Sequence, residues 1–229
     1  TVAQATALKV DQANGDITTI SITALTDTAA NVTAISAAAL ANVSGIVTAN
    51  SYINQTLTNV STQTLNVVTA DTAVLDSAKL STADGITIGA GIATIDASTT
   101  DEASLAAKTT VNNGSTLTIN NYVNTDLSGL SNQGSGSIVV NTTTGAVLDE
   151  SKLADATSVV LGATATGAAA AIDGIGISGA KINLNNQILN VSDYTNQDLS
   201  GISSTGTLNV TTVTGAVLDA TKLATADSV

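Results

Sequence analysis

Residues 194–229 read YTNQDLSGISSTGTLNVTTVTGAVLDATKLATADSV. They decide the fold, because they repeat sequence found twice earlier in the chain. Similar text begins at Tyr122 (YVNTDLSGLSNQGSGSIVVNTTTGAVLDESKLADATSV) and at Tyr52 (YINQTLTNVSTQTLNVVTADTAVLDSAKLSTADGI). Tyr52, Tyr122 and Tyr194 begin the three copies, and they are the only aromatic residues. The chain is therefore a repeat array, and its fold and function have to be inferred from the repeat.

Every lysine belongs to one of two columns of this repeat. The motif Leu-Asp-x-x-Lys-Leu occupies 75–80, 148–153 and 218–223, and a weaker copy occupies 5–10. The second column contains Lys108 and Lys181, each followed by a β-branched residue and, slightly later, by a pair of asparagines. We expect one continuous stack of repeats of about 71 residues over 1–229. Its expected divisions are 1–51 (partial), 52–121, 122–193 and 194–229 (partial).

Composition narrows the class of protein. The chain is 43% hydrophobic and 10% charged, and its apolar residues are mostly small or β-branched, which suits many thin coils better than one thick core. The net charge of −12 argues against nucleic acid, whose phosphates need a basic surface, and against an anionic membrane surface. The absence of cysteine excludes disulfides, and the absence of histidine removes the commonest general base. No apolar run approaches about 18 residues, so we expect no membrane insertion in this segment.

Short β-branched runs recur at fairly regular intervals along the chain. Their connectors are too long for hairpins, which need roughly two to five residues. The pattern predicts an all-β fold, a right-handed parallel β-solenoid with short flanking helices and about three coils per repeat. A leucine-rich-repeat-like solenoid is the alternative. The expected strands are 17–22, 45–48, 64–68, 85–88, 115–119, 137–140, 158–161, 181–184 and 207–211.

Several connectors have a helical appearance. Residues 74–80 and their copies place Asp three positions before Lys, and residues 100–108 (TDEASLAAK) have an acidic first turn and a final Lys. Residues 26–40 and 167–172 are rich in alanine. We expect helices of one to three turns at a corner or flank of the coil.

The repeated acidic and amide residues have two interpretations. Asp76/Lys79, Asp149/Lys152 and Asp219/Lys222 are predicted to form i,i+3 surface ion pairs, and an amide crosslink through lysine is the sharper alternative. Asn124 and Asp126, with Asn196 and Asp198, offer spaced oxygen ligands for calcium. The competing interpretation is that these side chains cap turns, because Asn and Asp at turns commonly do so.

The tyrosines and carboxylates carry the remaining hypotheses. Tyr52, Tyr122 and Tyr194 could form a row of surface contacts for carbohydrate or a neighbouring subunit. The alternative is that their rings pack against the coil and their hydroxyl groups stay exposed to solvent. The remaining candidates for catalysis are carboxylates, such as the neighbouring pairs Asp101/Glu102 and Asp149/Glu150. An active site is normally built once, so the repetition predicts that the chain is not an enzyme.

The segments TGAVLDxxKLA, DLSGIS and TLNVTT, with a bias to Thr, Ala and Asn and no Cys, resemble repetitive extracellular proteins of bacteria. That group includes giant adhesins, S-layer-like proteins and surface fibres. The resemblance implies a structural repeat region of a long secreted cell-surface protein that forms a stalk, layer or self-assembling filament. Its partners would be copies of itself or neighbouring repeats, end to end. The alternative is an adhesin module that binds carbohydrate or another cell surface. Because the text stops inside a repeat, we expect a piece of a longer protein.

Overall fold

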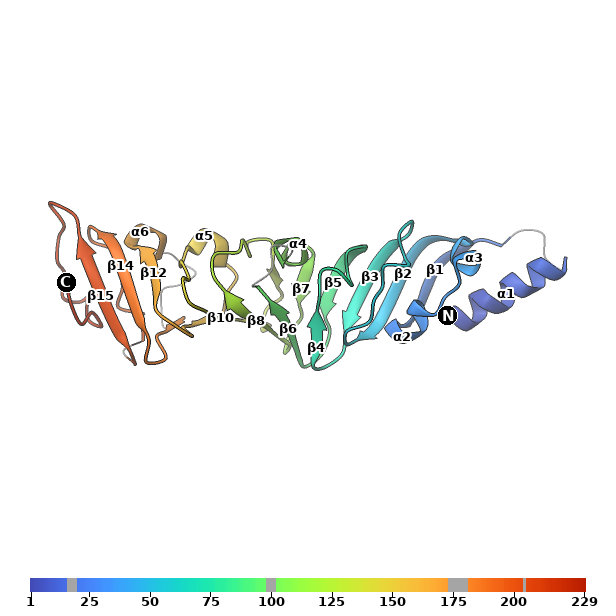
Figure 1. Ribbon diagram of the computed structural model, residues 1–229, viewed down its shortest axis with the longest axis horizontal. Helices are drawn as coiled ribbons and strands as arrows, with labels where there is room; N and C mark the ends of the chain where they lie inside the picture. The colour runs from blue at the N-terminus through green and yellow to red at the C-terminus, as the bar shows by residue number, and fades with distance from the viewer. Residues whose placement is uncertain (16–19, 98–101, 173–180, 204) are drawn as a thin grey trace.

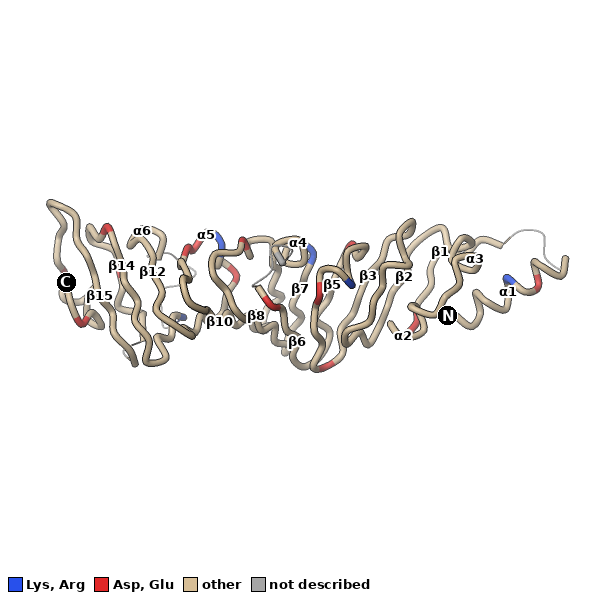
Figure 2. The backbone as a smooth tube through the Cα atoms, viewed as in Figure 1, with Lys and Arg blue, Asp and Glu red and all other residues tan. Residues whose placement is uncertain are grey.

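The computed structural model describes residues 1–15, 20–97, 102–172, 181–203 and 205–229. Figure 1 shows a long, narrow molecule with the N-terminal helix at one end and the last strand at the other. About 37% of the residues are in strands and 16% in helices. Lysines and carboxylates are scattered along the length rather than gathered in one patch (Figure 2).

The strands form three sheets, and each strand pairs in parallel with its neighbours. The prediction of a mostly β chain with parallel sheets and few helices is confirmed. The first sheet contains, in order, β1 (Ile22–Thr28), β2 (Val43–Tyr52), β3 (Thr64–Thr69), β5 (Ala83–Ile88), β7 (Thr109–Val111) and β9 (Ser131–Asn132). The second contains β4 (Ala73–Leu75), β6 (Ile92–Asp96), β8 (Thr116–Tyr122), β10 (Ser137–Thr142), β11 (Ser158–Val160) and β13 (Ile182–Asn183). The third contains β12 (Ala165–Ala168), β14 (Ile188–Tyr194) and β15 (Thr207–Thr212).

Within each sheet the strands follow one another in chain order, so like side chains stack. In the second sheet Ile119 pairs with Val140, Val140 with Val159, and Val159 with Ile182. All four are fully buried. Burying each such side chain stabilises the fold by roughly 1.5–3 kcal/mol. The alternation of small β-branched residues in the sequence thus becomes a continuous apolar ladder along the molecule.

Six helices lie among the described residues, and most fall where the sequence predicted them. Helix α1 was not predicted: Thr1 caps it in a capping box, and Gly15 ends it in the left-handed conformation, with φ of 86°. The predicted helix at 100–108 forms only over the middle of its range, and residues 98–101 lie outside the described part. The helices are α1 (Val2–Asn14), α2 (Ala29–Thr33), α3 (Ala37–Leu40), α4 (Glu102–Ala106), α5 (Glu150–Leu153) and α6 (Ala169–Ile172).

The predicted helix at 74–80 is wrong in its first copy. Residues 73–75 form strand β4, whose Val74 pairs with Thr94, and residues 76–80 form turns. A partner strand is available at this point, and its hydrogen bonds outweigh the weak helical tendency of so short a segment. Of the copies at 74–80, 147–153 and 217–223, only the second contains a helix, α5. The expected strand at 17–22 begins outside the described residues, and β1 starts at Ile22.

Equivalent strands of the three copies lie in three different sheets. The strand at 64–69 is β3 in the first sheet, its copy at 137–142 is β10 in the second, and its copy at 207–212 is β15 in the third. Each repeat thus advances the equivalent strand by one sheet. The expected solenoid with about three coils per repeat stays a prediction.

Candidate functional site

The feature that recurs in every copy is a turn that we call the lysine corner: residues 76–80, 149–153 and 219–223. In the first, the backbone N–H groups of Lys79 and Leu80 donate to the carbonyl oxygen of Asp76 at 3.1 and 3.0 Å. The Asp76 side chain accepts from the N–H of Ala78 at 2.9 Å. Such Asx capping satisfies groups that a short turn leaves unpaired. The other corners repeat it, with Asp149 accepting from Ser151 and Asp219 from Thr221.

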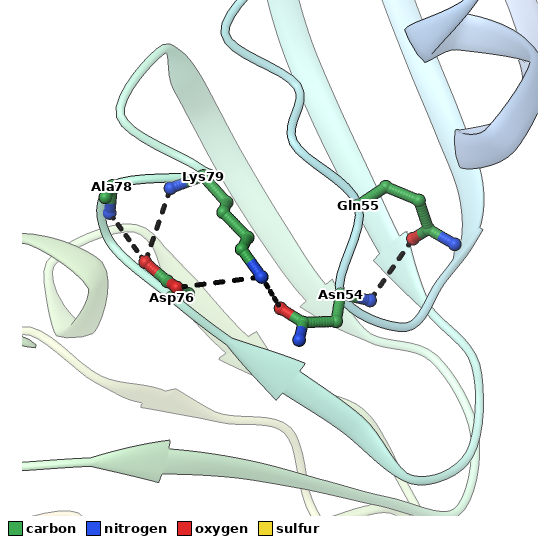
Figure 3. Close-up of polar contacts among 5 residues, drawn as sticks. All are labelled: Asn54, Gln55, Asp76, Ala78 and Lys79. Atoms are coloured by element: carbon green, nitrogen blue, oxygen red, sulfur yellow. Dashed lines mark hydrogen bonds and ion pairs between the residues drawn. The ribbon is translucent and has the colours of Figure 1, made fainter.

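Each corner lysine reaches back to the segment that follows the tyrosine of its own copy. Lys79 Nζ donates to Asn54 Oδ1 at 2.9 Å (Figure 3). Lys152 Nζ donates to Asn124 Oδ1 at 2.8 Å, and Lys222 Nζ to the carbonyl oxygen of Asn196 at 2.9 Å. A charged donor makes these stronger than neutral hydrogen bonds. The lysine therefore ties together two segments that are distant in the sequence.

A backbone hydrogen bond accompanies each of these lysine contacts. The carbonyl oxygen of each corner lysine accepts from the N–H of a buried leucine in the same earlier segment. The pairs are Leu57 to Lys79 (2.9 Å), Leu127 to Lys152 (3.1 Å) and Leu199 to Lys222 (2.9 Å).

The predicted ion pairs are present only in part. Lys79 Nζ lies 3.9 Å from Asp76 Oδ2, which matches the i,i+3 prediction. Hydrogen bonds from Thr221, and to a lesser degree the charge of Lys222, hold the pKa of the Asp219 carboxyl below its usual range. Neither Asp149/Lys152 nor Asp219/Lys222 forms a salt bridge in the described part of the chain, so the close pairing is seen there only in the first copy. The reason is geometric: the aspartate oxygen is used by its own turn, and the ammonium group extends to the neighbouring asparagine.

The four residues proposed as calcium ligands make other contacts. Asp126 Oδ1 accepts from the N–H of Ser128 and Asp198 Oδ1 from that of Ser200, each at 3.0 Å. Hydrogen bonds from the serine hydroxyl and backbone hold the pKa of both carboxyls below the usual range. Asn124 and Asn196 accept from lysine, whose positive charge opposes a cation there. No group of three or more acidic side chains placed to hold a metal occurs among residues that the structure describes. Calcium binding remains a prediction.

The three tyrosines do not form a surface row. Tyr52, Tyr122 and Tyr194 are all fully buried, so the proposed surface contact is wrong, and the alternative of packing against the coil holds for the rings. Along each strand the alternation of buried positions breaks just before the tyrosine, where the strand register shifts and the preceding residue has a positive φ (Ser51 55°, Asn121 58°, Asp193 59°). This local change of direction turns the ring into the core. The hydroxyls of Tyr52 and Tyr122 are buried without a hydrogen-bond partner. Burial raises the pKa of both phenols well above the usual value.

Two grooves lined by described residues gather no catalytic groups. One, of about 420 Å³, lies between α1 and β1, and Asp11 is its only charged lining residue. The other, of about 340 Å³, is lined by uncharged residues of β12, β14, β15 and Val147. Asp149 caps its own turn, and the pair at 101–102 falls at or beside the undescribed segment. The prediction that the chain is not an enzyme stays a prediction.

The sequence predicted the lysine corner but not the asparagine segment that each corner lysine contacts. The signal was present, because in every copy an asparagine stands two positions after the tyrosine and the corner lysine follows it at a similar separation. Recognising that these two residues pair requires knowing which strands lie next to each other. Reasoning from the sequence also missed the groove between α1 and β1, because α1 itself was not predicted.

No protein family, curated protein or solved structure matches this chain. No helix in the described ranges is long and apolar enough to cross a membrane. Function is therefore inferred from the sequence and the geometry of this chain.

Proposed function

We propose that the chain is a right-handed, three-sided parallel β-solenoid that serves as a rod-like structural segment of a long extracellular bacterial surface protein. The observation that carries this is the buried ladder Ile119–Val140–Val159–Ile182, which runs through the neighbouring strands β8, β10, β11 and β13. The order in which the chain visits the sheets supports three sides. Ser131 lies in the first sheet and Ile138 in the second, and Val147 bridges to Thr166 in the third.

Coil length then sets the dimensions of the rod. Parallel strands are about 4.8 Å apart, so one coil of about 21 residues advances the axis by that distance. A repeat of about 71 residues equals about three and one third coils, which explains why each copy lies one sheet further on. The rod formed by residues 22–228 is then roughly 48 Å long. Lysine corners and apolar ladders connect successive coils along it, as a stalk, layer or filament requires.

The extracellular assignment rests on the resemblance of the repeat text to bacterial surface proteins and on a cysteine-free, acidic composition. The alternative of a carbohydrate-binding adhesin loses its main support, because the tyrosines are buried and do not form an aromatic binding surface. Detection of the protein on intact cells by antibody labelling, and its release by external protease, would test the location. A signal found only after lysis would overturn it.

The rod is tested by adding length. A variant in which residues 122–193 are duplicated should lengthen the particle by about 16 Å at constant cross-section, measured by small-angle X-ray scattering. An increase in both dimensions, as for a larger globule, would overturn the solenoid.

A further inference from the structure

Two of the lysine corners hold an amine next to a side-chain carboxamide. In the first copy, Lys79 Nζ donates to Asn54 Oδ1 at 2.9 Å. In the second copy, Lys152 Nζ donates to Asn124 Oδ1 at 2.8 Å. The carbon atom that carries each of these oxygens is the atom that an amine attacks when it forms an amide. Both corners therefore bring together the two reactants of an amide crosslink.

The backbone on both sides of the first contact is anchored. Tyr52 and Leu57, on either side of Asn54, are fully buried. The N–H of Leu57 donates to the carbonyl oxygen of Lys79 at 2.9 Å, so the backbone that carries the lysine is held against the same segment. Gln55 Oε1 accepts from the N–H of Asn54 at 3.3 Å and restrains it further (Figure 3). Because the fold already holds the reactants together, the reaction becomes effectively unimolecular.

A carboxylate lies beside each of the two ammonium groups. Asp76 Oδ2 is 3.9 Å from Lys79 Nζ. In the second copy, hydrogen bonds from Ser128 and, to a lesser degree, the charge of Lys152 hold the pKa of the Asp126 carboxyl below its usual range. The effect of this charge places Asp126 near the ammonium group. An ionised carboxylate in this position can accept a proton from the amine and return it to a leaving group.

We propose that Lys79 forms an amide crosslink with Asn54. Lys152 forms the same crosslink with Asn124. Each crosslink closes a covalent loop across 25 or 28 positions of the chain, and so converts the hydrogen bond of the corner into a permanent connection between two segments. The proposal rests on these contacts and does not depend on the proposed solenoid.

The reaction exchanges one amide for another. The carboxylate takes a proton from the ammonium group, and the neutral Nζ attacks the side-chain carbon of the asparagine. The carboxylic acid returns this proton to the departing nitrogen, which leaves as ammonia. Nζ loses its second proton as the new amide forms, and the ammonia takes it up. A lysine ammonium group and a carboxamide thus become a secondary amide and an ammonium ion, and the reaction needs neither an oxidant nor a cofactor.

Two other lysines provide controls within the chain. Lys222 Nζ donates to the backbone carbonyl oxygen of Asn196 at 2.9 Å, and Lys108 Nζ donates to that of Ala83 at 2.7 Å. Attack on a backbone carbonyl would break the chain instead of releasing ammonia. We therefore expect these two control lysines to keep their ammonium groups.

Mass spectrometry and trypsin cleavage test the crosslinks. In the freshly refolded chain the contacts are hydrogen bonds, and incubation at mildly alkaline pH should then lower the mass by one ammonia per crosslink. Trypsin cuts this chain only after lysine, because it contains no arginine. After denaturation, the incubated chain should be cut at least tenfold less at Lys79 and Lys152 but as before at the two control lysines. Tandem mass spectrometry should find peptides 10–108 and 109–181, each joined internally through the expected lysine and asparagine.

Single substitutions identify the reacting groups. Lys79→Arg and Asn54→Ala should each abolish the first crosslink and leave that of Lys152 unchanged, which also shows that the variant is folded. Asp76→Asn keeps an acceptor for the turn but removes the carboxylate, so it should slow the first crosslink at least tenfold; an unchanged rate would overturn the role of that carboxylate. An unchanged mass after incubation, equal protection of the control lysines, or an ammonia loss at Asn54 that survives Lys79→Arg would each overturn the crosslink. The last result would identify a succinimide at the asparagine instead.

Discussion

Residues 73–80 and 216–223 are nearly the same text, AVLDSAKL and AVLDATKL, in very different surroundings. In the first, Leu75 and Leu80 are buried under the next strand and turn. In the second, Leu218 is largely exposed and Leu223 only half-buried. The turn itself is unchanged, because Asp76 and Asp219 cap it in the same way. Local sequence thus determines the corner, whereas the neighbouring strand determines its burial, as expected for a repeat protein whose stability depends on contacts between neighbouring units.

Replacing Leu75 and, separately, Leu218 by alanine tests this difference in burial between the two copies. Leu75→Ala should lower the free energy of unfolding by about 2–5 kcal/mol, because it leaves a cavity beneath β6. Leu218→Ala should change it by less than about 0.5 kcal/mol, as for an exposed position. Urea unfolding followed by circular dichroism measures both. Equal losses would show that Leu218 is covered in solution by another chain or segment.

Replacing a buried tyrosine tests how the burial of its hydroxyl affects the free energy of unfolding. Tyr52→Phe should raise the free energy of unfolding by about 1 kcal/mol at pH 7, because it removes a buried hydroxyl without a partner. The folded-state pKa of Tyr52 is raised, so its protonated form is favoured by folding. That contribution is complete below the unfolded pKa of about 10 and is lost as pH rises above it. The unfolding midpoint should therefore fall above about pH 10 in the natural chain, and Tyr52→Phe should weaken this fall. An unchanged alkaline slope would contradict it.

Removing the aspartate cap should change the free energy of unfolding by less than removing Leu75, with a smaller difference between copies. Asp149 precedes α5, and the buried Leu153 follows it, so Asp149→Ala should cost about 0.5–2 kcal/mol. Asp219→Ala removes the same turn bonds from a corner with a half-buried leucine, and its effect should be smaller. Thermal unfolding at pH 7 compares the two. A larger loss at Asp219 would mean that the last corner supports more structure than its exposure indicates.

The corner lysines should show the smallest effects. Lys79→Met should lower the free energy of unfolding by at most about 1 kcal/mol, since its bonds to Asp76 and Asn54 are partly exposed. The loss should shrink in about 1 M salt, which screens the ion pair. Lys222 bonds to a backbone carbonyl, so Lys222→Met should depend less on salt. The same salt dependence in both variants would contradict the assignment of the ion pair to the first copy.

Much of the strand content was predictable, because buried β-branched residues alternate with polar ones. The Thr64–Thr69 strand matches its prediction to within one residue. Segments whose structure depends on a distant partner were not predictable. The short segment Ala73–Leu75 does not separate strand from turn without knowledge of β6. Residues 1–15 carry a weak corner motif, yet form α1, because a capping box and alanine-rich text favour a helix where no strand lies alongside.

The candidate site follows the same division. The Asp caps are local, and the sequence predicted them as the alternative to calcium. The hydrogen bond from Lys79 to Asn54 joins distant parts of the sequence and depends on which strands lie next to each other. Burial of the tyrosines also depends on stacking, since the residues around Tyr122 are polar and gave no sign of a core position. The advance of each copy by one sheet depends on connector lengths that vary from turn to turn, and only the observed pairing reveals it.

That advance has a mechanical consequence. In the proposed solenoid, the lysine corners are the least regular part of each coil. A repeat of three whole coils would align them along one side of the rod, which would then bend more easily toward that side. Copies that occupy three sheets in succession distribute the corners evenly around the axis. The same corner returns to a given side only after three repeats, roughly 48 Å along the rod. Bending stiffness is then nearly equal in every direction, so the rod has no preferred plane in which to buckle.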